Sequence, residues 1–169
     1  MTDTTDALEL LKSQHDDVEA LIGRIEDCED LDEKLELFAE LADKLAAHST
    51  IEEKLFYPSV LDDDTTELLI EATEEHLAVK RVLADMLALD PDDDHWDAKL
   101  AVLKEEVRHH ARDEEEGKLF PILERALTED FRAALGNELL AMFEELLEQE
   151  PRNQVPSETT EAAPLEVGM

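Results

Sequence analysis

Four histidines occupy positions where helical periodicity requires core residues. Apolar residues recur every three or four positions along four segments, which is typical of amphipathic helices. Each of these stripes also contains one histidine: His15, His48, His76 or His110. A single histidine in such a stripe is usually a core residue with a hydrogen-bond partner. Four buried imidazoles are costly unless something offsets their desolvation, and a bound metal does so directly.

Carboxylates accompany two of these histidines. Glu52 follows His48 by four residues and therefore lies on the same helix face, one turn later. The segment after His110 also contains several glutamates. A set of imidazoles and carboxylates without sulfur suits iron, manganese or zinc. Six protein ligands are too many for one catalytic zinc, and they predict two metals bridged by two carboxylates, with coordination positions left open.

The fourth helix offers two candidate carboxylate ligands, Glu114 and Glu115, and a weak internal repeat bears on the choice between them. In segments 48–58 and 110–121, a Glu-Glu pair begins six residues before a proline. This register favours Glu115, whereas regular periodicity from His110 points to Glu114. A spacing of five is about 140° out of phase on a regular helix. Glu115 therefore requires a local distortion such as a π-bulge, which is frequent at functional sites.

The elements that must position these residues are long helices. Only 4 Gly and 6 Pro are present, and abundant Leu, Ala and Glu favour an all-α protein. Helices are predicted at about 4–27, at 31–57 before Pro58, from a capping run at 62–66, from 96 to an end marked by Gly117 and Pro121, and at 129–148. Because the first two and the next two form antiparallel hairpins, we predict an up-down-up-down four-helix bundle with a short additional C-terminal helix and a disordered tail.

The chain length of 169 residues suits one domain. We assign residues 1–150 to the helical bundle. Residues 151–169 are rich in Pro, Thr and Glu, and this composition predicts a disordered acidic tail.

The formal net charge of −32 excludes several classes of partner. A protein this acidic repels phosphate backbones and anionic membranes, so we expect no nucleic acid and no membrane partner. No apolar run approaches the roughly 18 residues of a membrane span, and the N-terminus lacks the features of a signal peptide. The expected location is the cytoplasm. The single cysteine, Cys28, excludes an intrachain disulfide and a cysteine-based zinc site.

The acidity also predicts a dependence of stability on salt. With 47 acidic and 15 basic residues, most carboxylates lack a partner, and self-repulsion opposes folding. The thermal midpoint should therefore rise with sodium chloride, steeply at first and less so near ~1 M, where the screening length falls to a few Å. The metal-free protein should depend on salt more than the loaded one, because bound metal stabilises the native state by itself. Adaptation to a high-salt habitat would account for this acidity, because salt screens self-repulsion. A midpoint that is flat in salt for both forms would contradict both the self-repulsion and this explanation.

Taken together, the order of these residues resembles the hemerythrin-like HHE family. The pattern is His…His-x-x-x-Glu…His…His-x-x-x-x-Glu, with EEKLFYP and EEGKLFP closing the second and fourth helices, and it covers about residues 7–125. The resemblance implies a four-helix bundle around two iron ions in an oxo- or hydroxo-bridged di-iron centre. It also implies that Glu52 and Glu115 bridge the irons. The implied metal ligands are His15, His48, Glu52, His76, His110 and Glu115.

One departure from this family bears on function. Oxygen-carrying hemerythrins have a fifth histidine one turn before the third-helix ligand, where this chain has Ala72. One iron would then keep an additional exchangeable position. This favours reaction with oxygen, peroxide or nitric oxide over simple oxygen carriage, and we take catalase-like peroxide decomposition as the first hypothesis.

Three alternatives remain open. The first is a protein that senses or stores iron or oxygen. The second is a ferritin-like carboxylate enzyme, which needs two Glu-x-x-His pairs, whereas this chain offers only Glu106-x-x-His109. The third is a metal-free helical bundle that binds other proteins. The sequence does not determine the oligomeric state or an electron donor.

The remaining polar residues near the predicted ligands receive simpler interpretations. His95 is predicted to be exposed, His109 to face solvent or a neighbouring helix, and Glu53 and Glu116 to be surface charges. Tyr57 follows the turn that contains Glu52 and is a further hypothesis, as a hydrogen-bond donor or redox partner of the metals.

Overall fold

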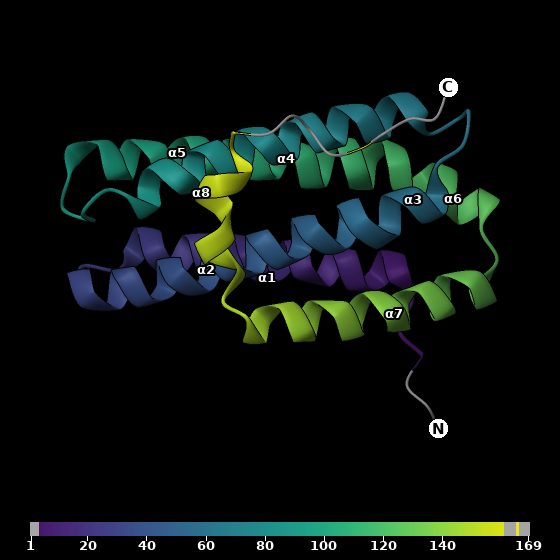
Figure 1. Cartoon of the computed structure of the whole chain (residues 1–169), viewed down its shortest axis with the longest axis horizontal. Helices are drawn as coiled ribbons and strands as arrows, with labels where there is room; N and C mark the ends of the chain where they lie inside the picture. The colour runs from purple at the N-terminus through teal and green to yellow at the C-terminus, as the bar shows by residue number, and fades with distance from the viewer. Residues whose placement is uncertain (1–3, 161–164, 166–169) are drawn as a thin grey trace.

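The computed structural model describes residues 4–160 and residue 165, and in these residues it contains helices and no strands. The predicted all-α bundle is confirmed. Four helices form two antiparallel hairpins (Figure 1): α1 (Ala7–Asp27) with α2 (Leu31–Ile51), and α4 (Thr66–Leu87) with α5 (Asp94–Arg108). No helix in the described part of the chain combines the length and apolar character that crossing a membrane requires.

The ends of these helices follow from their capping residues. Asp6, Asp30 and Asp93 each accept hydrogen bonds from backbone N–H groups of the first turn that they precede. Thr128 does the same for α7 (Glu129–Glu148). Such side chains satisfy donors that have no partner within the helix. The predicted start of the fifth helix is therefore confirmed to the residue.

Two helices continue beyond the prolines that were predicted to end them. The second passes through a π-helical segment, η1 (Glu52–Phe56), into α3 (Tyr57–Val60); the fourth passes through η2 (His109–Leu119) into α6 (Phe120–Ala126). The N–H of Tyr57 bonds to the carbonyl of Glu52, and that of Phe120 to the carbonyl of Glu115, five residues back in each case. The next residue in both segments is proline. Proline has no backbone N–H, so the change from π-helical to α-helical bonding coincides with a residue that cannot donate.

The C-terminal segment packs on the bundle. After α7, which lies along α1 and α2, the segments η3 (Pro151–Gln154) and α8 (Val155–Glu158) cross in front of α2 to reach α4 (Figure 1). Val155 is buried in the core and Arg152 pairs with Asp43 at 2.6 Å. Residues 151–160 thus differ from the predicted disordered tail, because a few anchoring contacts outweigh an acidic, proline-rich composition. Residues 161–164 and 166–169 of that tail lie outside the described residues.

A polar layer divides the hydrophobic core into two clusters. One cluster, toward the α4–α5 turn, includes Trp96, Phe38 and Leu41. The other includes Phe56 and Leu139 and lies where α7 covers the first hairpin. The predicted histidine positions fall between these clusters, so that apolar packing on both sides fixes the helices that carry them.

Gly136 marks the closest approach of α7 to the start of α1. A Cβ atom added at this position would lie 1.8 Å from the carbonyl oxygen of Thr5 and 2.8 Å from the amide nitrogen of Ala7. Because these are backbone atoms, Gly136→Ala should lower the free energy of unfolding by about 1–3 kcal/mol. The matched control is Gly23→Ala, where nothing lies within 4 Å and helix propensity should raise stability by up to about 1 kcal/mol. Chemical denaturation of both variants measures the difference, and equal effects would show that α7 does not pack this closely.

Candidate metal centre

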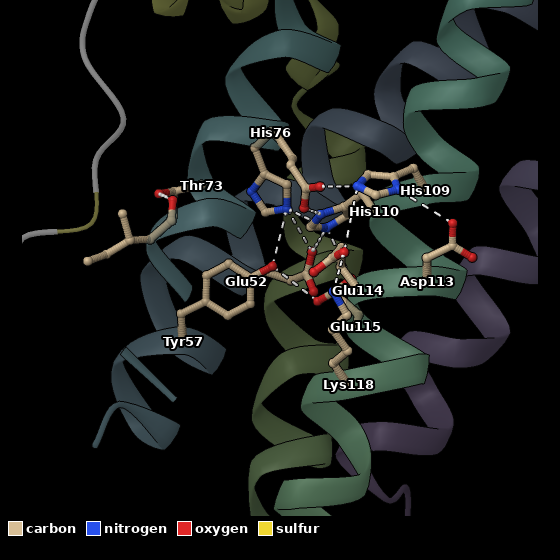
Figure 2. Close-up of polar contacts among 12 residues, drawn as sticks. Glu52, Tyr57, Thr73, His76, His109, His110, Asp113, Glu114, Glu115 and Lys118 are labelled. Carbon is tan, nitrogen blue, oxygen red and sulfur yellow. Dashed lines mark hydrogen bonds and ion pairs between the residues drawn. The ribbon is translucent and has the colours of Figure 1, made fainter. Parts of the chain in front are cut away.

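The six predicted ligands converge in one buried layer. None is more than 6% exposed. They form two groups whose potential ligand atoms lie within 4.8 Å of one another, His15–His48–Glu115 and Glu52–His76–His110. Each group takes two histidines from one hairpin and its carboxylate from the other, so the layer requires both hairpins. Figure 2 shows Glu52, His76, His110 and Glu115 pointing toward one another.

Both carboxylates lie between imidazoles of the two groups. Oε1 of Glu52 is 3.0 Å from Nε2 of His48 and 3.1 Å from Nε2 of His76. Oε1 of Glu115 is 3.2 Å from Nε2 of His15 and 3.1 Å from Nε2 of His110. Each carboxylate therefore contacts one histidine of each group, as expected for a bridging position.

The structure brings Glu115, and not Glu114, into this layer. Glu115 is 1% exposed, while the side chain of Glu114 bonds to Lys118 at 2.9 Å. The π-helical turn of η2 supplies the distortion that a spacing of five requires. The π-helical segment η1, which begins at Glu52 itself, was not predicted, because a spacing of four needs no distortion.

Every histidine of the layer is held from outside through its other ring nitrogen. Nδ1 of His15 contacts Glu116 at 2.7 Å, and that of His76 contacts Glu53 at 3.0 Å. The two remaining pairs are His48 with Gln14 at 2.6 Å and His110 with Glu75 at 2.9 Å. A ligand histidine is usually oriented in this way, because an Nδ1–H donor directs the Nε2 lone pair at the metal.

Glu53 and Glu116 are therefore not the surface charges that were predicted. Each follows a central carboxylate by one residue and reaches a histidine of the other hairpin. Gln14 and Glu75 each precede a central histidine by one residue. The sequence signal for these contacts is the Glu-Glu pair that both halves of the internal repeat contain.

The chemistry of these contacts fits a bound cation. With Nδ1 donating outward, a neutral imidazole presents a lone pair at Nε2. The Nε2 atoms of His76 and His110 are 3.0 Å apart, so two lone pairs would face each other. Nε2 of His48 and Oε2 of Glu52 are buried without a hydrogen-bond partner in the described residues. Positive charge between these atoms would satisfy all of them.

The close packing of imidazoles and carboxylates also shifts the pKa values of residues in the layer. Burial lowers the pKa of His110, but the charge and hydrogen bond of Glu115 outweigh it, and the pKa lies well above its ordinary value. The pKa values of His15 and His76 are also raised against burial, chiefly by hydrogen bonds to Glu115 and Glu52 respectively. For Glu52, burial raises the pKa, yet the surrounding imidazoles hold it well below its usual value. In the absence of metal, protons supply the positive charge.

This predicts opposite pH dependences for the metal-free and loaded proteins. A raised histidine pKa stabilises the folded state fully below the unfolded value of 6.5, and this stabilisation is lost as pH rises through the folded value. The thermal midpoint of metal-free protein should therefore fall as pH rises above ~6.5, measured in ~0.5 M salt to screen surface charge. The loaded protein should instead lose metal as pH falls, because protons compete for the ligands. A flat midpoint for the metal-free protein above pH ~6.5 would contradict the raised pKa values.

Aromatic rings cover the two groups in a nearly symmetric way. Phe120 stacks on His15 with ring centroids 6.3 Å apart, and Tyr57 stacks on His76 at 5.6 Å. Both rings come five residues after a central carboxylate. Only Tyr57 carries a hydroxyl, which donates to Oε2 of Glu115 at 3.0 Å and lies 3.4 Å from Nε2 of His76. The hypothesis that Tyr57 approaches the layer thus agrees with the geometry.

Burial and the nearby carboxylates Glu115 and Glu52 raise the pKa of Tyr57 well above its ordinary value. The phenol therefore keeps its proton near neutral pH. His95, in contrast, is exposed as predicted. His109 is about half exposed and also contacts Glu75 of the neighbouring helix α4. Tyr57 thus places a proton donor beside the layer, whereas Phe120, at the equivalent position of the second hairpin, offers none.

A small cavity adjoins the layer on the side away from Tyr57. Its volume is about 20 Å³, enough for one molecule about the size of water. Besides the four histidines, its lining includes one apolar residue from each helix, three positions from that helix's histidine: Val18, Leu45, Val79 and Val107. Only a very small molecule could reach the imidazoles from this side.

Comparison with known proteins agrees with this geometry. Residues 6–123 match the model of the hemerythrin HHE cation binding domain. The chain is also similar to a solved structure, a hemerythrin HHE cation binding domain-containing protein that is the Rv2633c homologue of Mycobacterium kansasii, with 28% identity and a TM-score of 0.75. That match covers 85% of this chain and 88% of the other. No curated protein matches the chain. The family match spans well over half of the chain and includes all six converging residues, and the chain therefore belongs to the hemerythrin HHE cation-binding domain family.

Proposed function

We propose that this chain is a non-haem di-iron protein that decomposes peroxide at its buried layer. The observation that carries the proposal is the pair of groups His15–His48–Glu115 and Glu52–His76–His110, joined by two carboxylates that each contact both groups. The four histidines would be terminal ligands, and Glu52 and Glu115 would bridge. Nitrogen and oxygen donors of this kind suit iron, and two irons would supply two-electron redox chemistry and Lewis acidity.

The residues around the layer make the two metal positions unequal. The position of the fifth histidine of oxygen carriers is occupied by Ala72, which is buried and has no ligand atom. The phenol of Tyr57 lies near His76, which is on the same helix, α4, as Ala72. Tyr57 can thus donate a hydrogen bond, or pass a proton, to a molecule bound on that side, and it also holds Glu115 in place.

On the side of the layer away from Tyr57, access favours a very small molecule. The cavity of about 20 Å³ shares His15, Val107 and Ala111 with a second cavity of about 40 Å³. The second cavity also touches Lys104 and Arg112, whose side chains are partly exposed. Peroxide disproportionation, 2 H₂O₂ → 2 H₂O + O₂, fits such a site because the substrate is both oxidant and reductant. No partner for electron transfer is required.

The test is metal content together with oxygen release. The full chain expressed with ample iron should contain two irons, show near-ultraviolet charge-transfer bands, and release one O₂ for every two H₂O₂ consumed. Glu115→Gln should lower both iron content and oxygen release severely. Glu124→Gln is the matched control, because this glutamate lies on the continuation of the same helix but is exposed, and it should keep both.

The possible results separate the proposals. Near-zero metal would leave a metal-free bundle, and one metal per chain would mean that the group without a fifth histidine binds weakly. Iron without oxygen release would eliminate peroxide decomposition but keep the di-iron centre.

A second candidate function is the binding of oxygen or nitric oxide without turnover. The apolar lining and small volume of the cavity favour it, since an uncharged diatomic molecule gains from such surroundings. Spectral changes on adding nitric oxide to the reduced protein, reversed when the gas is removed, would support this function over peroxide decomposition.

A further inference from the structure

A second group of potential metal ligands lies outside the buried layer. Glu71 and Glu75 of α4 and His109 of η2 each offer one ligand atom, and these atoms lie within 4.8 Å of one another. Nε2 of His109 is 3.1 Å from Oε2 of Glu75 and 3.7 Å from Oε1 of Glu114. This outer group, Glu71–Glu75–His109–Glu114, thus combines one imidazole with three carboxylates.

Glu114 gives the outer group a feature that surface acids do not share. Its side chain is only 9% exposed, and its Oε2 is buried with no hydrogen-bond partner among the residues described. Its other oxygen accepts from Lys118 at 2.9 Å (Figure 2). A buried carboxylate with an unpartnered oxygen is costly, and a cation bound through Oε1, the oxygen that lies 3.7 Å from Nε2 of His109, would offset part of that cost.

The π-helical turn of η2 builds the outer group as well as the inner one. A spacing of five brings Glu115 within 3.1 Å of His110, and the same spacing brings Glu114 within 3.7 Å of His109. Adjacent residues thus form two parallel His–Glu pairs. The pair His110–Glu115 faces the core, whereas His109 is about half exposed at 47%, so the outer group is open to solvent.

The first hairpin has no such group. Aligning the two hairpins on their central residues places Leu10, Gln14, Ala47 and Ile51 opposite the four outer residues. All four are buried, and Leu10 and Ile51 lie in the core cluster that includes residues of α7. The second hairpin carries residues of ligand type at every one of these positions.

We propose that the outer group Glu71–Glu75–His109–Glu114 is a second, surface-accessible site for a divalent transition metal. One imidazole and several carboxylates suit Fe²⁺, Mn²⁺ or Zn²⁺. Glu75 joins this site to the buried layer, because its Oε1 accepts from Nδ1 of His110 at 2.9 Å while its Oε2 faces His109. The site goes beyond the proposed function, since it does not depend on which metal occupies the buried layer.

Zn²⁺ binding to the full chain as purified tests the site. Calorimetric titration in ~0.5 M sodium chloride suppresses loose binding to the surface with its net charge of −32. The wild-type protein should bind one Zn²⁺ saturably, and His109→Ala should weaken this binding at least ~10-fold, as the loss of one of few ligands does. His95→Ala is the matched control, because His95 is also an exposed histidine beside an acid, 3.1 Å from Asp93.

A third variant is expected to strengthen Zn²⁺ binding rather than weaken it. Lys118→Met removes the ammonium group that bonds to Glu114, so Zn²⁺ should bind more tightly. Iron content, measured before and after titration, reports the buried layer separately. Absence of saturable binding, equal losses in His109→Ala and His95→Ala, or Zn²⁺ uptake matched by iron release would each overturn the outer site. Low iron in every variant, with binding that still depends on His109, would contradict the di-iron proposal and support the outer site.

Discussion

Glu52→Ala is expected to abolish metal loading and to destabilise the metal-free fold. Glu52 is fully buried, and its Oε1 lies between Nε2 of His48 and Nε2 of His76. Removing the carboxylate takes away the proposed bridge and leaves both imidazoles without their counter-charge. Buried polar groups that lose a partner cost about 1–3 kcal/mol, so the metal-free variant should unfold at a lower denaturant concentration.

The matched control for Glu52 is Glu36→Ala. Glu36 lies on the same helix and is exposed, so its removal should change neither iron content nor stability by a measurable amount. Elemental analysis and urea denaturation of the two variants make the comparison. If Glu52→Ala keeps its iron, the proposed bridging role of the Glu52 carboxylate is wrong.

Glu53→Ala should weaken iron binding by roughly 10–100-fold, the usual effect of removing an outer partner of a ligand histidine. Glu53 accepts from Nδ1 of His76 at 3.0 Å and from Nζ of Lys80 at 3.3 Å. Without it, the ring of His76 is free to turn and its Nε2 becomes a weaker ligand. Competition with a chelator of known affinity measures the change.

Two variants separate the effect on His76 from the effect on Lys80. Glu53→Gln keeps an oxygen that can accept from His76 and should retain most of the affinity. Lys80→Met removes the other partner and should leave the affinity near wild type. Losses of equal size in Glu53→Ala and Lys80→Met would show that Glu53 acts through the ion pair rather than by orienting the imidazole.

The sequence by itself determined the helices and the four histidines. Both follow from local rules: the stripes that place His15 and His76 inward need only 3.6 residues per turn, and the caps Asp6 and Thr128 bond to backbone groups two or three residues away. Glu52 belongs to the same class, since a spacing of four from His48 needs no information from the rest of the fold.

Tertiary structure decided everything that depends on contacts between helices. The internal repeat and the family pattern favoured Glu115 over Glu114, but only the structure shows the π-helical segment that carries Glu115 into the layer against local periodicity. Glu53 and Glu116 lie off the apolar stripes and look like surface charges, yet each meets a histidine more than 20 residues away. Val155 anchors a segment whose composition predicts disorder. In each case the free energy comes from a partner that is distant in sequence, and patterns of spacing within one helix carry no information about such partners.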